Sequence, residues 1–138
     1  MSETMEGETK CVCGGPGIAE GGKKRVLFTC SGGSSTGQIA NHAAVRLAQE
    51  GFGIMVCIAG VPSRAPPVME KLAQGEAIVV LDGCPVACAR KVLEMQGIRA
   101  DQHIVVTDLG IKKTKELVPA EEEIEKVVDA AWRGQGEL

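Results

Sequence analysis

Short, almost continuous hydrophobic runs alternate with amphipathic segments along most of this 138-residue chain. The runs lack the apolar–polar alternation of a half-exposed sheet, and continuous apolar runs of this length are typical of strands that are covered on both faces. The predicted strands cover residues 25–30, 53–57, 77–82 and 103–108. The pattern therefore predicts four buried strands.

Segments with helical periodicity separate these strands. Apolar residues at helical spacing predict a first helix that ends at Gly51. Prolines mark the starts of the other three helices, because proline is favoured in the first helical turn: Pro67, Pro85 and Pro119. With Pro85 as the first helical residue, Cys84 is predicted to be the N-cap of its helix.

Strand–helix alternation predicts parallel strands joined by right-handed crossovers. The expected fold is an α/β three-layer sandwich with a mainly parallel four-stranded sheet, flavodoxin/Rossmann-like, and strand order 2-1-3-4 is favoured. The chain divides into a flexible, glycine-containing tail at residues 1–24, which carries Cys11 and Cys13, and one α/β domain at residues 25–138.

Composition narrows the range of partners. Aromatic residues make up 2% of the chain and the net charge is -3, so neither base stacking nor phosphate binding is favoured and nucleic acid is not an expected partner. No apolar run reaches the roughly 20 residues of a membrane helix, and the N-terminus lacks the apolar segment of a signal peptide. We therefore expect no membrane partner and a cytoplasmic location. Six cysteines in a reducing compartment are expected to be ligands, redox groups or core residues.

Cysteines follow three of the predicted strands. Cys30, Cys57 and Cys84 all fall at carboxyl ends, and parallel strands present these ends at one edge of the sheet, where open α/β folds bind ligands. Cys88 lies one helical turn beyond Cys84. His103 begins its strand and is expected at the opposite edge. An all-sulfur set predicts a Cys₄ site for zinc, with another thiophilic metal or an iron–sulfur cluster as alternatives.

Three other interpretations stay open. A strand-end cysteine, Cys57 above all, can simply fill space in the core. Cys84 can instead be the reactive thiolate of a thiol-disulfide or sulfur-transfer protein, with Cys88 or Cys30 as the second thiol. The loop after the first strand can cradle an anion or cofactor, although a tight turn beside Cys30 is the commoner explanation: Gly32, Gly33 and Ser34.

The segment Asp82-Gly83-Cys84-Pro85-Val86-Ala87-Cys88-Ala89-Arg90-Lys91 resembles the central signature of the DGC-domain family of proposed zinc-binding proteins. Two other segments are similar to that family as well: Cys30-Ser31-Gly32-Gly33 and Thr107-Asp108-Leu109-Gly110. The resemblance covers about residues 10–130. It implies that the four chelating cysteines are Cys30, Cys57, Cys84 and Cys88, and it names a ligand and not a reaction. Our leading hypothesis is a metal-binding protein that is a metal carrier or sensor.

Overall fold

In the computed structural model, which describes residues 13–138, four parallel strands form one sheet in the order β2-β1-β3-β4. The strands are β1 (Arg25–Thr29), β2 (Ile54–Met55), β3 (Ala77–Asp82) and β4 (Gln102–Val105). The helices are α2 (Ser35–Gln49), α3 (Pro66–Gln74), α4 (Cys88–Met95) and α5 (Glu121–Trp132). The predicted fold class and strand order are confirmed.

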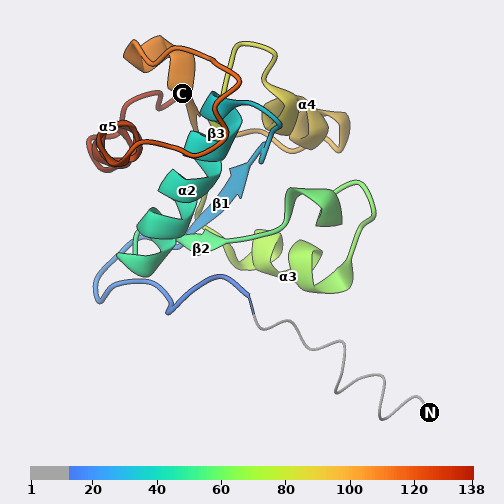
Figure 1. Cartoon of the computed structure of the whole chain (residues 1–138). Helices are drawn as coiled ribbons and strands as arrows, with labels where there is room; N and C mark the ends of the chain where they lie inside the picture. Colours follow the sequence, from blue (N-terminus) through green and yellow to red (C-terminus); the bar gives the residue numbers. More distant parts are fainter. Residues whose placement is uncertain (1–12) are drawn as a thin grey trace, which may run out of the picture.

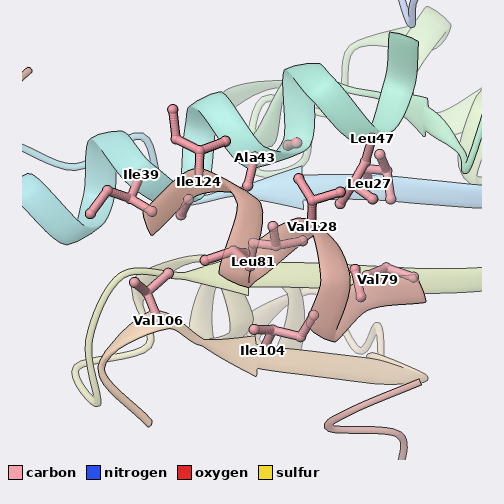
Figure 2. Close-up of a cluster of buried hydrophobic side chains, with 14 of the residues drawn as sticks. Leu27, Ile39, Ala43, Leu47, Val79, Leu81, Ile104, Val106, Ile124 and Val128 are labelled. Atoms are coloured by element: carbon pink, nitrogen blue, oxygen red, sulfur yellow. The ribbon is translucent and has the colours of Figure 1, made fainter. Parts of the chain in front are cut away.

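Helices cover both faces of the sheet (Figure 1). Because side chains alternate between the faces of a strand, β1 sends Leu27 to one side and Val26 and Phe28 to the other. Leu27 lies in the larger core, against α2 and α5, and Figure 2 shows side chains from these helices meeting those of β1, β3 and β4. Phe28 lies in the smaller core with residues of α3 and α4. The sheet is thus the middle layer of a three-layer sandwich.

Irregular segments cover the edges of the sheet. At β2, Met55 N–H donates to the carbonyl of Gly14 (3.2 Å). At β4, His103 N–H donates to the carbonyl of Gly136 (2.9 Å). Residues 13–24 therefore touch the domain, whereas residues 1–12, including Cys11, lie outside the described part of the chain; the division at residue 24 stays a prediction.

Several predicted boundaries need correction. Strand β2 is shorter than predicted and β4 ends earlier, because residues Val106–Leu109 form a 3-10 helix. Helix α2 is capped by Ser34, whose hydroxyl accepts from Gly37 N–H at 3.3 Å. Among residues 13–138, no helix has both the length and the apolar character needed to cross a membrane.

Candidate metal centre

Cys30 continues β1 by one residue at the carboxyl edge of the sheet. Its N–H donates to the carbonyl of Leu81 (3.2 Å), so its side chain falls on the same face as Phe28, the face covered by α3 and α4. The thiol is half-buried, and its sulfur accepts a hydrogen bond from Gly83 N–H (3.4 Å). Cys30 is therefore held against the loop that follows β3.

That loop places Cys84 differently from the prediction. Ala87 N–H donates to the carbonyl of Cys84 (3.0 Å), so residues 84–87 form a turn with Pro85 at its second position, where proline is favoured. Helix α4 begins only at Cys88, with Ala87 as the N-cap in a left-handed conformation (φ 54°). The predicted N-cap role of Cys84 is wrong, because the proline serves the turn and not the helix.

The N–H groups at the start of α4 are instead bound by a carboxylate from the sheet. Asp82, at the end of β3, accepts from Ala89 N–H (2.9 Å, Oδ1) and Arg90 N–H (3.2 Å, Oδ2). His103 Nε2 lies 2.8 Å from the same Oδ2. The backbone of His103 is early in β4, opposite Val80, but its ring reaches the carboxyl end of β3. The expectation that His103 lies at the opposite edge is therefore wrong for its side chain.

A lysine reaches the cysteines from the segment after β4. Lys113 Nζ lies 3.5 Å from Cys84 Sγ. Two hydrogen bonds hold this segment to the first residue of α2: Thr114 N–H donates to Ser35 Oγ (2.7 Å), and Ser35 N–H donates to the carbonyl of Thr114 (3.1 Å). Sequence reasoning missed Lys113, because nothing in the sequence indicates that this segment folds back onto α2.

Three cysteines line one cavity of about 320 Å³ between the loops after β1 and β3: Cys30, Cys84 and Cys88. Lys113 and Asp82 lie in the same lining, as do the predicted anion-loop residues: Gly32, Gly33 and Ser34. Each of the two loops contains a non-glycine residue in the strained left-handed region, Ser31 (φ 47°) in the first and Ala87 in the second. Strain of this kind often accompanies a functional site.

Cys57, the fourth predicted ligand, lines a different cavity of about 480 Å³ together with Cys13. The register explains the separation: Leu27 pairs with Met55, so Cys57 falls level with Thr29 and shares its face. That is the face of α2, whereas Cys30 belongs to the other face. Ser31 lines the cavity of Cys57 and its neighbours in the chain line the cavity of Cys30, so the loop after β1 runs between the two cavities.

The donor set of the Cys30 cavity suits a thiophilic metal, since thiolate sulfur is a preferred zinc ligand. Within residues 13–138, however, no group of three or more His, Cys, Asp or Glu side chains is already arranged to hold a metal ion. Burial raises the pKa of the Cys30 thiol above its usual 9.0, and the charges of Asp82 and Cys88 add to this effect, whereas hydrogen bonds from Gly83 and Gly32 N–H oppose it.

Comparison with known families gives the site its context. A profile of the family described as the DGC domain matches residues 26–131. The chain belongs to the DGC-domain family. A curated relative, the "Anaerobic and virulence modulator AnvM" of Pseudomonas aeruginosa, is 34% identical to this DGC domain over 88 residues, or 64% of the chain and 67% of the relative. The match of the DGC domain includes Cys30, Cys57, Cys84 and Cys88. No solved structure matches the chain.

Proposed function

We propose that this DGC domain binds a thiophilic metal ion, zinc in the first instance, through Cys30, Cys84 and Cys88, and works as a metal carrier or sensor. The observation that carries the proposal is the common cavity of the three thiols. Cys84 lies in the loop after β3 and Cys88 begins α4, whereas Cys30 follows the end of β1, so binding links these segments. Zinc commonly takes four ligands, and three protein thiolates leave one position open for exchange.

The surroundings of the thiols support this proposal. Three thiolates around Zn²⁺ carry a net negative charge, and the ammonium of Lys113 beside Cys84 partly offsets it. Backbone N–H groups also face the site, as Gly83 N–H does towards Cys30. A carrier or sensor would also suit a family whose curated relative is named a modulator.

The proposal is tested by metal analysis of protein purified without air. About one zinc ion per chain is expected, and Cys30→Ser, Cys84→Ser and Cys88→Ser should each lower retention sharply after dialysis against a weak chelator. Cys57→Ser is the matched control, since this cysteine lines the other cavity and should leave retention nearly unchanged. Full retention by the Cys84→Ser, Cys88→Ser double variant would refute the proposal. A loss with Cys57→Ser equal to that with Cys84→Ser would restore the predicted Cys₄ set.

One contact favours a second candidate function, thiol-disulfide or sulfur-transfer chemistry at Cys84. The Lys113 ammonium, 3.5 Å from Cys84 Sγ, can donate a charge-assisted hydrogen bond to an anionic sulfur. In this case mild oxidation by a small disulfide would link Cys84 reversibly to Cys88 or Cys30, with two thiols released from the oxidant. Zinc should protect these three cysteines from alkylation under the first proposal, and should protect none of them under the second.

A further inference from the structure

The segment between Cys84 and Cys88 is held at both ends by one residue, Asp82, through its backbone at one end and its side chain at the other. Asp82 precedes Gly83 and Cys84 directly in the chain, so its own backbone fixes where the loop leaves the sheet. Its carboxylate binds the N–H of Ala89, the residue after Cys88, at 2.9 Å. The separation of the two cysteines therefore depends on the orientation of the Asp82 carboxylate.

His103 fixes that orientation from the neighbouring strand. Its Nε2 lies 2.8 Å from Asp82 Oδ2, and the side chains are 7% and 1% exposed. An ionised carboxylate only accepts hydrogen bonds, so His103 Nε2–H is the donor of the hydrogen bond to Asp82. Arg90 Nη1 lies 3.5 Å from the other ring nitrogen, Nδ1, which makes this a long contact. Both ring nitrogens of His103 therefore face charged side chains, Asp82 and Arg90.

Packing of the sheet does not require this polar pair. The strand partner of His103 is Val80, a hydrophobic residue of the smaller core. A hydrophobic side chain therefore suits this face of the sheet. Burying a carboxylate is unfavourable unless its hydrogen bonds are satisfied, and Asp82 accepts from the N–H groups at the start of α4 and contacts His103. The pair therefore stabilises the arrangement of the loop rather than the hydrophobic core.

We infer that His103 is a positioning residue for the thiol pair of Cys84 and Cys88, and that it acts through Asp82. The inference rests on the proposed metal-binding function for its consequence, because a metal site needs its ligands at a fixed separation. Residues that orient metal ligands from the next layer typically contribute about 10–100-fold to metal affinity. Without His103, the Asp82 carboxylate can turn, and the start of α4 loses its fixed distance from Cys84.

The test compares three variants of the full chain. His103→Leu removes the donor to Asp82, whereas His103→Gln keeps an N–H group at similar reach. Gln102→Leu is the matched control: Gln102 is the neighbouring residue of β4, is buried, and binds the carbonyls of Ala131 and Gln135 on the other side of the sheet. Zinc affinity is measured by competition with a chromophoric chelator, and folding by the fluorescence of Trp132, the one tryptophan of the chain.

A second readout does not depend on zinc. A trivalent arsenical, R–As=O, condenses with two thiols to give R–As(SR)₂ and one water, and it reports whether Cys84 and Cys88 stand at bridging distance. Mass spectrometry of the peptide that carries both cysteines gives the rate of bridging in the metal-free protein.

In the folded protein, His103→Leu should lower zinc affinity about tenfold or more and slow arsenical bridging, and His103→Gln should restore most of both. Gln102→Leu should lower stability and leave both readouts at the wild-type level. If His103→Leu and Gln102→Leu behave alike in both readouts, the inference is refuted. Wild-type protein that fails to bind zinc would refute the proposed function, and the arsenical rates would then still decide the positioning role.

Discussion

Replacing Gly83 with alanine tests whether the loop after β3 must lie against the first turn of α2. An added Cβ at Gly83 would lie 2.5 Å from the N atom of Gly37 and 2.7 Å from the carbonyl carbon of Thr36. Both are backbone atoms, so no side-chain rotation can relieve the contact. Because non-bonded heavy atoms rest at about 3.5 Å or more, the loop after β3 and the first turn of α2 would have to separate by about 1 Å.

This separation has an expected size in free energy. Overpacking of a close contact costs typically about 1–3 kcal/mol, and we expect Gly83→Ala to lower the free energy of unfolding by about 2 kcal/mol. With a urea slope of about 1–3 kcal/mol per molar, the midpoint should fall by about 1 M, as followed by Trp132 fluorescence. The same shift moves Gly83 N–H away from Cys30 Sγ and should weaken zinc binding as well.

Gly33→Ala is the matched control for this experiment. Gly33 lines the same cavity, but an added Cβ there meets nothing within 4 Å, and neither glycine has a positive φ. The control should unfold at the wild-type urea concentration. A Gly83→Ala protein with unchanged stability would show that the loop after β3 is not in close contact with the first turn of α2 and would refute this prediction.

Two further predictions concern pH and the N-terminal segment. The pKa of Cys30 is higher in the folded protein than the usual 9.0. Metal-free protein should therefore keep its full free energy of unfolding below pH 9.0 and lose part of it as the pH rises through the folded pKa. Cys30→Ala should flatten this decline in urea titrations and Cys57→Ala should not. An equal decline in the Cys30→Ala protein would refute this reasoning. Deleting residues 1–22 should lower the free energy of unfolding by about 1–2 kcal/mol more than deleting residues 1–12, because the hydrogen bonds from Met55 N–H to the Gly14 carbonyl and from Ala19 N–H to the Gly51 carbonyl are lost. Identical stability of the two truncated proteins would support the predicted tail boundary at residue 24.

The sequence was sufficient for the fold class and strand order of the sheet, because hydrophobic periodicity and parallel topology place strand ends together. The carboxyl edge brings Cys30 and Cys84 into one cavity as predicted. The position of Cys57 was missed because the prediction considered only the edge of the sheet and not its two faces. One residue of offset along a strand moves a side chain to the other face of the sheet. The start of α4 was missed because Pro85 suits either a helix or a turn, and only the Asp82 carboxylate decides between them.

Long-range contacts explain what no local pattern could indicate. Lys113 reaches Cys84 through hydrogen bonds between its neighbour Thr114 and Ser35, far apart in the sequence. His103 looked like a residue of the far edge, because its side-chain reach across to Asp82 depends on the register between β3 and β4. These contacts come from tertiary packing, which spacing along the chain does not encode.

Residues 136–138 pair with the outer edge of β4, and this pairing also affects the strand that carries His103. Gly136 accepts a hydrogen bond from the backbone of His103, and Leu138 N–H donates to the carbonyl of Asp101 (2.9 Å). Residues 136–138 thus restrict the movement of the strand that carries His103. Removing residues 136–138 would loosen the strand that carries His103, so a metal-binding measurement should be made on protein that retains these residues.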